Sequence, residues 1–428
     1  MLIIKNAYLL NPATGFEGMV TIYTDHGIIT DIVGGAEDEE NYPEGVQVID
    51  ATGLTAIPGL IDVHTHFRDP GFTYKEDIES GSKAAAAGGY TTVIMMCNTK
   101  PAIDNVDTLK DCLLKGEKTP IRVLSCAAVT KGLKGEELTD IPALLQAGAV
   151  GLTDDGIPIM NEALVREVFT KAAEYNVPVS LHEEDPALIT NNGVNRGAAS
   201  QFYQIGGSPR EAEITMIERD LAIALETGAI VNIQHISTKE GVALVRKAKA
   251  HPGNRVHAEA TPHHIALTEE DVIAKGTLAK VNPPIRMEED RQAIIEGLKD
   301  GTIDIIATDH APHAPEEKEK DITQAPSGML GLETALSLCI GKLVKEAGMS
   351  LMEVVDKLTA APAAMYHLPF GDVSVGKSAD IVLVNPDEKW IVEGFRSKSQ
   401  NSPFIGEEMT GRIHCTICEG KIVYRLVK

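Results

Sequence analysis

His64 and His66, two histidines separated by one residue, are the first side chains along the chain whose types and spacing could do chemistry. They follow the apolar run Leu60-Ile-Asp-Val63, which is typical of a buried strand. Side chains at i and i+2 of a strand share a face, so both imidazoles could bind one ion while Thr65 points away. Imidazole and carboxylate groups are usual zinc ligands. The pair therefore predicts a metal site whose other ligands lie elsewhere in the chain.

Further polar residues share this placement, because each follows a short β-branched or apolar run. They are Asn98, the neighbours Asp154 and Asp155, His182, His235 and Asp309. A lone histidine near a strand end is more often structural than a ligand, and we interpret His251, His257, His263 and His264 in that way. The repeated placement at several strand ends favours one shared site for the others.

The central part of the chain alternates strand-like runs with helical stretches. Eight such runs are found between Gly59 and Leu368: 60–63, 91–96, 121–124, 150–153, 177–181, 230–233, 255–258 and 303–306. This alternation predicts an α/β fold, a (β/α)8 TIM barrel over residues 56–369, with its chemistry at the C-terminal ends of the strands. The candidate residues fall at those ends.

Both ends of the chain instead read as short strands separated by turns. We expect residues 1–55 and 370–428 to form one small composite β-sandwich domain. Cys415 and Cys418 are the only close cysteine pair, and their spacing in a strand sends the side chains to opposite faces, so we interpret them as structural.

Composition limits the possible partners. The 428 residues carry a formal net charge of −23, which argues against binding to nucleic acid or to an anionic membrane. An apolar run long enough to span a membrane is not found, nor is a secretory leader, and the six cysteines do not form a disulfide framework. We expect a cytoplasmic protein with a small-molecule substrate.

Several motifs together resemble the amidohydrolase superfamily, and within it the bacterial class I dihydroorotases. The resemblance covers nearly the whole chain and rests on Gly59-Leu-Ile-Asp-Val-His-Thr-His-Phe-Arg-Asp-Pro-Gly71, Met96-Cys-Asn-Thr99, Val281-Asn-Pro-Pro-Ile-Arg286 and Ala307-Thr-Asp-His-Ala-Pro-His313. One departure is Glu183, where the family commonly has cysteine.

The resemblance implies a zinc enzyme with one or two ions per subunit. It places His64, His66 and Asp309 at one metal position and His182 and His235 at a second. A carboxylate after the fourth strand would bridge them in place of the carbamylated lysine of hydantoinases. Strand alternation lets only one of the two neighbouring aspartates face the site, and the family's spacing favours Asp155 over Asp154.

The implied reaction is reversible hydrolysis of dihydroorotate to N-carbamoyl-L-aspartate in pyrimidine biosynthesis. Zinc would lower the pKa of a bound water, and Asp309 would accept and return its proton. The substrate-binding positions that the resemblance implies are His66, Phe67, Arg68, Asn98, Asn282, His313, Ser327 and Gly328. Arg68 suits the substrate carboxylate because guanidinium can pair with it through two donors; the alternative for Arg68 is a surface ion pair with Asp69.

Two other functions stay open from the sequence. A hydantoinase or allantoinase would share fold and metals but lacks the need for the Arg68 clamp. A non-catalytic partner of aspartate transcarbamoylase would have lost metal ligands, which this chain keeps. A homodimer and association of the active enzyme with aspartate transcarbamoylase are also expected from the resemblance.

Overall fold

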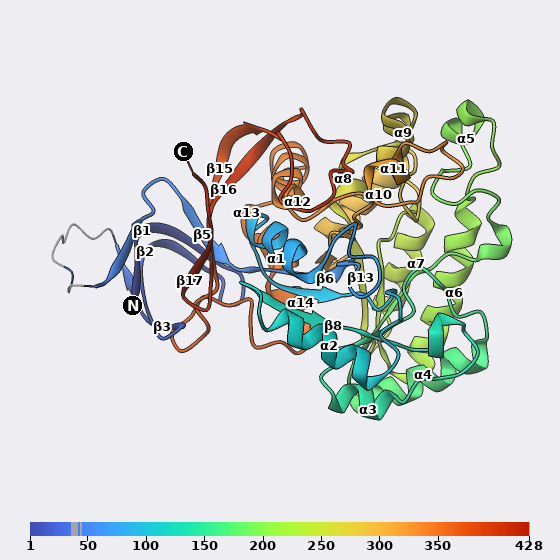
Figure 1. The fold of residues 1–428 in the computed structure, drawn as a ribbon, viewed down its shortest axis with the longest axis horizontal. Coiled ribbons are helices and arrows are strands. Elements are labelled where there is room, and N and C mark those ends of the chain that lie inside the picture. Colours follow the sequence, from blue (N-terminus) through green and yellow to red (C-terminus); the bar gives the residue numbers. More distant parts are fainter. Residues whose placement is uncertain (36–41, 43–44, 428) are drawn as a thin grey trace.

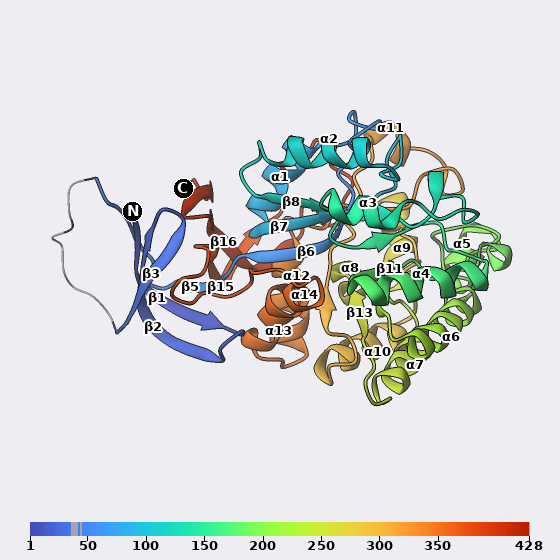
Figure 2. The ribbon, with the colours of Figure 1, turned by 90° about the horizontal axis from the view of Figure 1, so that it is seen from below.

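The computed structural model describes residues 1–35, 42 and 45–427, which form an α/β protein with a β-rich end and a helix-rich end. Both chain termini lie at the β-rich end (Figure 1). Seen from below, strands β6, β7 and β8 extend from that end into the helical part (Figure 2). The candidate site residues follow these and the later central strands, so they lie in the helix-rich part.

The β-rich end is one eight-stranded sheet built from both ends of the chain, in the order β17-β16-β15-β5-β1-β2-β3, with β4 paired to β1. The strands are β1 (Leu2–Asn11), β2 (Phe16–Asp25), β3 (Ile28–Gly34), β4 (Gln47–Asp50), β5 (Thr55–Pro58), β15 (Ile381–Ile391), β16 (Glu408–Cys418) and β17 (Lys421–Arg425).

The strands of this sheet are hydrogen-bonded into one continuous sheet, and residues of both β2 and β16 belong to one apolar cluster. Strand β5 pairs with β1 and β15, so the sheet extends to Pro58, three residues beyond the expected boundary at 55. The sequence had suggested no separate strand there because 55–58 runs into the next apolar segment.

All eight strands expected in the centre are present and every pairing among them is parallel. One sheet has the order β6-β7-β8 and the other β14-β13-β12-β11-β10-β9. Their bounds are β6 (Leu60–Thr65), β7 (Tyr90–Met95), β8 (Arg122–Ser125), β9 (Ala127–Ala128), β10 (Leu152–Thr153), β11 (Pro178–Leu181), β12 (Ile230–Ile233), β13 (Val256–Ala260) and β14 (Ile305–Ile306). Strand β8 corresponds to the expected strand at 121–124, and β9, which follows it after Cys126, was not expected.

Helices connect these strands and bury them. They are α1 (Ile78–Ala87), α2 (Val106–Gly116), α3 (Ile141–Gln146), α4 (Glu162–Tyr175), α5 (Ala198–Tyr203), α6 (Arg210–Thr227), α7 (Lys239–Lys249), α8 (Pro262–Ala266), α9 (Glu269–Lys275), α10 (Glu288–Lys299), α11 (Pro315–Lys318), α12 (Ala335–Cys339), α13 (Leu351–Leu358) and α14 (Ala360–Met365). A π-helical turn, Ile340–Glu346, continues α12, and short 3-10 turns cover Lys131–Leu133, Pro186–Leu188 and Gly276–Ala279.

Several helices start at residues whose side chains accept from free N–H groups of the first turn. Asp77 caps α1 by accepting from the Ser80 N–H, and Thr238 caps α7 by accepting from the Gly241 N–H. The apolar faces of the helices pack against the strands. Strands such as β11 and β12 are buried on both faces, and all their residues are buried. The strands are thereby held rigidly, and the polar residues at their C-terminal ends are positioned by this packing.

Among the described residues, helices long and apolar enough to cross a membrane are absent. Cys415 and Cys418 are buried free thiols in β16, and the other four cysteines are also free and buried.

Candidate metal centre

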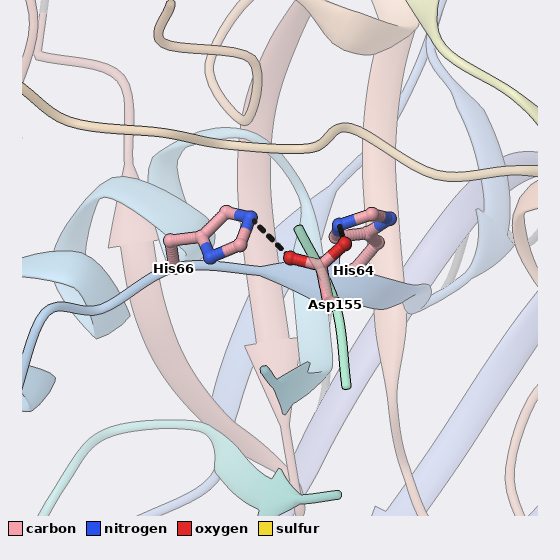
Figure 3. Close-up of side chains that lie close together, drawn as sticks. All are labelled: His64, His66 and Asp155. Carbon is pink, nitrogen blue, oxygen red and sulfur yellow. Dashed lines mark ion pairs between the residues drawn. The ribbon is translucent and has the colours of Figure 1, made fainter. Parts of the chain in front are cut away.

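His64, His66 and Asp155 meet at the ends of strands β6 and β10 (Figure 3). The Asp155 carboxylate lies between the imidazoles, with Oδ1 3.4 Å from His64 Nε2 and Oδ2 3.5 Å from His66 Nε2. All three side chains are buried. The shared face expected from their i, i+2 spacing therefore brings both histidines to one carboxylate.

Asp155 also faces a second histidine pair, His182 and His235, which follow β11 and β12. Its Oδ1 lies 3.9 Å from His182 Nδ1 and 3.9 Å from His235 Nε2, while these two nitrogens are 3.0 Å apart. The two groups that could each hold an ion thus share Asp155.

Asp309 completes the first group from the end of β14. Its Oδ1 is 2.9 Å from His66 Nε2 and 3.5 Å from His64 Nε2. Asp154, in contrast, turns away and accepts hydrogen bonds from the N–H groups of Val129 and Thr130 and from the Thr130 hydroxyl. Of the two neighbouring aspartates, the structure brings Asp155 to the histidines.

The histidine tautomers fit a metal site. His64 donates from Nδ1 to Glu259 Oε1 and His66 donates from Nδ1 to Asn98 Oδ1, at 2.5 and 2.9 Å. Nε2 of each ring is then the nitrogen that faces the carboxylates and would bind a metal ion, as in ligand histidines whose other nitrogen donates to a carboxylate or carbonyl. His64 Nε2 is buried and has no hydrogen-bond partner among the described residues. A cation would satisfy this nitrogen.

The electrostatics of the group favour ionised carboxylates. Burial alone would raise the pKa of Asp155, but His64 and His66 outweigh it and hold that pKa well below its usual range. Burial likewise opposes ionisation of Asp309, whose pKa is nevertheless lowered by His64 and His66. Burial, together with His182 and His64, lowers the pKa of His235 far below its usual value, so this ring is neutral and able to ligate.

Left-handed backbone conformations occur at three residues of this region. Arg68, His235 and Asp309 have φ of 59°, 32° and 47°, a region that non-glycine residues rarely adopt. Such conformations persist only where the surroundings impose them, and they concentrate at functional sites.

A cavity of about 340 Å³ opens beside the histidines and carries most of the expected substrate-binding residues. Its lining includes His66, Arg68, Asn98, Asn282, His313, Ser327 and Gly328. Arg68 donates from Nε to the Pro312 carbonyl, while Asp69 pairs with Lys115 at 2.7 Å, so the alternative ion pair between Arg68 and Asp69 is absent.

Phe67 is a correction to the expected set. Its ring is fully buried in the apolar core beneath α1 and does not line the cavity. The Phe67 ring packs against Gly81 of α1, which lies over it. Any contact with a ligand in the cavity would come from its backbone.

Several polar residues of the site were missed from the sequence. Glu259 ends β13, accepts from His64 and also receives Asn232 Nδ2 at 2.8 Å; its position after a β-branched run was a signal that could have identified it. Lys280 and Asn192 line the cavity from loops, where local patterns carry no such signal. Glu183 is buried away from the cavity lining, beside Asp220.

Residues 55–423 match the Amidohydrolase family model. The chain is 50% identical over 424 residues to a dihydroorotase of Clostridioides difficile and 49% identical over 426 residues to one of Clostridium acetobutylicum, with at least 99% of each chain covered.

The chain belongs to the amidohydrolase family, among its dihydroorotases.

A solved amidohydrolase-type structure agrees with this membership at the level of the fold. L-hydantoinase (dihydropyrimidinase) from Arthrobacter aurescens superimposes with a TM-score of 0.87 at 27% identity, covering 100% of this chain and 97% of that one. The chain is a hydrolase of cyclic amides. Its family is metal-dependent, and the chain has two groups of histidine and aspartate side chains suited to metal ions.

Proposed function

We propose that this chain catalyses the reversible hydrolysis of (S)-dihydroorotate to N-carbamoyl-L-aspartate, a step of pyrimidine biosynthesis. The observation that carries the proposal is 50% identity to a dihydroorotase over 99% of the chain, together with two groups of histidine and aspartate side chains that could hold a metal ion. The hydantoinase alternative is supported by a structural relative that is only 27% identical to this chain.

The proposed metal is zinc, with one or two ions per subunit. His64, His66 and Asp309 would hold one ion, His182 and His235 the other, and Asp155 would bridge both. Nitrogen and carboxylate ligands without sulfur suit zinc, and the buried Nε2 of His64 supports occupancy by a cation. When bound, the metal supplies a Lewis acid that polarises the substrate carbonyl and activates water.

Asp309 is the proposed catalytic residue. It is ionised at neutral pH because neighbouring histidines lower its pKa, so its carboxylate can accept a proton from the attacking water. The same carboxyl group can then donate that proton to the departing ring nitrogen. In the reverse direction the roles exchange.

Substrate binding is assigned to the cavity side chains and to one glycine. Arg68 would pair with the substrate carboxylate, supported by Asn98 and His313, while Asn282 and the Ser327-Gly328 backbone would bind the ring amides. His313 is neutral, because burial, Arg68 and Lys75 lower its pKa to about 2, and a neutral imidazole can both donate and accept. Arg68 then remains the principal positive charge for a carboxylate.

We also propose that the parallel strands close into a (β/α)8 barrel, so that residues 56–369 form the catalytic domain and the two ends of the chain a second domain. Closure is supported by the parallel bridge between Thr65 and His310 and by the continuous chain from β8 to β9. The homodimer, association with aspartate transcarbamoylase and a cytoplasmic location stay predictions from the sequence.

The decisive experiment measures both directions with the zinc-loaded protein. Hydrolysis adds a carboxylate and releases a proton, so lower pH should shift the equilibrium toward dihydroorotate and higher pH toward carbamoyl aspartate. We expect turnover of dihydroorotate, ring closure of carbamoyl aspartate at acidic pH, and little activity on hydantoin, which has no carboxylate for Arg68. Preference for hydantoin, or the absence of ring closure at every pH, would contradict the proposal.

A further inference from the structure

The segment between β15 and β16, residues 392–407, leaves the β-rich sheet and contacts loops whose side chains line the cavity. It contacts two loops that carry substrate-binding candidates. The first, the Arg68 loop, comprises residues 67–77 after β6; the second, the His313 loop, comprises residues 310–331 after β14. Neither contact was expected from the sequence.

Asn401 makes the contact with the His313 loop. Its Nδ2 donates to the carbonyls of Ala311 and Gly328 at 3.0 and 3.1 Å, and its Oδ1 accepts from the His313 N–H at 3.0 Å. Its backbone carbonyl accepts from Leu330 N–H at 3.0 Å. Asn401 is only 3% exposed, and it pairs the buried Ala311 carbonyl and His313 N–H while sharing the Gly328 carbonyl with Lys318 Nζ.

The same segment holds the Arg68 loop a few residues earlier. Ser397 donates to the buried carboxylate of Glu76, and Ser399 Oγ donates to the Lys75 carbonyl at 2.8 Å. Lys75 in turn places Nζ 3.3 Å from His313 Nδ1. Residues 397–401 therefore connect the two loops whose side chains, Arg68 and His313, line the cavity together.

The backbone of the His313 loop is closely packed, which limits how far it can move if its hydrogen bonds to Asn401 are lost. Gly328 has φ of 132°, and a Cβ there would lie 2.7 Å from Ala311 Cβ and 3.0 Å from His313 Nε2. The loop is thus closely packed against itself, and it also contacts the Arg68 loop directly, through Arg68 Nε to the Pro312 carbonyl at 3.2 Å and through Lys75 to Glu317 at 2.8 Å. Asn401 supplies the connection from the β-rich sheet.

We propose that Asn401 is a positioning residue for substrate binding: through the 392–407 segment, the β-rich sheet sets the spacing between Arg68 and the His313 loop. The inference rests on the proposed function for its substrate. Asn401 contacts neither the metal-site side chains nor the cavity. Its effect is therefore indirect: it positions the residues that bind the substrate carboxylate and ring amides. Loss of a grip that is equal in ground and transition states raises KM and leaves kcat nearly unchanged.

The test compares Asn401→Ala with Asn11→Ala in the zinc-loaded enzyme. Asn11 is a matched control, since it is 1% exposed and its Nδ2 donates to Asp372 Oδ1 and to the Val373 carbonyl, both at 3.0 Å, far from the cavity. We expect Asn401→Ala to raise KM for dihydroorotate about tenfold, the equivalent of one or two hydrogen bonds, with unchanged zinc content. Asn11→Ala should lower the thermal midpoint without changing KM.

A second measurement needs no substrate. Amide hydrogen exchange of residues 310–331 should accelerate in Asn401→Ala and not in Asn11→Ala. Asn401→Asp, which keeps the acceptor for His313 N–H but loses both donated bonds, serves if the alanine variant does not fold. Unchanged KM and unchanged exchange in the Asn401 variants, or equal effects from Asn11→Ala, would overturn the inference. A wild-type protein that does not turn over dihydroorotate would contradict the proposed function instead, while the exchange result would still decide the role of Asn401.

Discussion

Single residues of the metal centre differ in role although they are equally buried. Asp309 and Asp154 are both buried aspartates near strand ends, yet Asp309 contacts two histidines and Asp154 contacts only the Val129-Thr130 segment. Their environments shift their pKa values in opposite directions: Asp309 downward, and Asp154, chiefly through burial, upward to about 6. Variants of Asp154 can therefore serve as matched controls for variants of Asp309.

Asp309→Asn should abolish turnover in both directions, because an amide can neither accept nor return the proton. A loss on the order of a thousandfold in kcat is expected for removal of a general acid-base group. Steady-state rates and zinc content measure it, with Asp154→Asn as the matched control that keeps most activity. An Asp309→Asn enzyme with normal kcat and full zinc would remove Asp309 from the reaction.

Asp155→Ala should lower zinc content, since it removes the carboxylate shared by both histidine groups, whereas Asp154→Ala should keep its zinc. Elemental analysis after dialysis against a weak chelator measures the difference. If Asp154→Ala instead lost the metal, the bridging role would belong to the other neighbour.

At the scale of elements, the His313 loop is held from inside by buried ammonium groups. Lys318 Nζ donates to the Pro326 and Gly328 carbonyls, both at 2.9 Å, and Lys280 Nζ donates to the Ile322 and Ala325 carbonyls, both at 2.7 Å. Burial, together with nearby Lys280, lowers the pKa of Lys318 to about 7. A neutral amine can still donate both bonds, so the loop keeps its contacts without a buried charge.

The stability of the chain should therefore depend on pH through Lys318. Between pH 7 and about 10.4, the usual lysine pKa, the unfolded chain binds more protons at this residue than the folded one, so its contribution to stability rises with pH. The thermal midpoint of the wild type relative to Lys318→Met should rise from pH 7 to pH 9, with exposed Lys320→Met as control. A constant difference across this range would show that Lys318 titrates normally.

At the scale of the whole molecule, the centre joins strands β6, β10, β11, β12 and β14, which are far apart in sequence. An ion bound there stabilises only the folded chain, because the unfolded chain does not assemble its ligands. Such binding adds about 2.7 kcal/mol when the free ion is at ~100 times its Kd.

Removal of the metal should lower the thermal midpoint of the entire chain, and added zinc should restore it. Differential scanning calorimetry before and after chelation measures this shift. Asp155→Ala, which starts with less metal, should respond less to the chelator. Equal midpoints with and without metal would argue against a site built from these separate strands.

The sequence by itself determined the strand pattern and identified most of the side chains that meet at the candidate metal centre. These features are local: a buried strand shows as an apolar run, its end as a polar residue, and the i, i+2 spacing of His64 and His66 fixes a common face. The expected strands were all found for this reason, and the residues at their ends came together at one edge.

The tertiary structure alone decided what depends on contacts between distant segments. β10 ends at Thr153, so strand alternation no longer governs Asp154 and Asp155; packing sends one to Thr130 and the other to the histidines. Phe67 lies in the core because α1 covers it. Asn401 contacts the carbonyls of Ala311 and Gly328, which are 90 and 73 residues away in the sequence. Hydrogen bonds of this kind leave no periodic trace in the sequence, because their partners are brought together only when the whole chain packs.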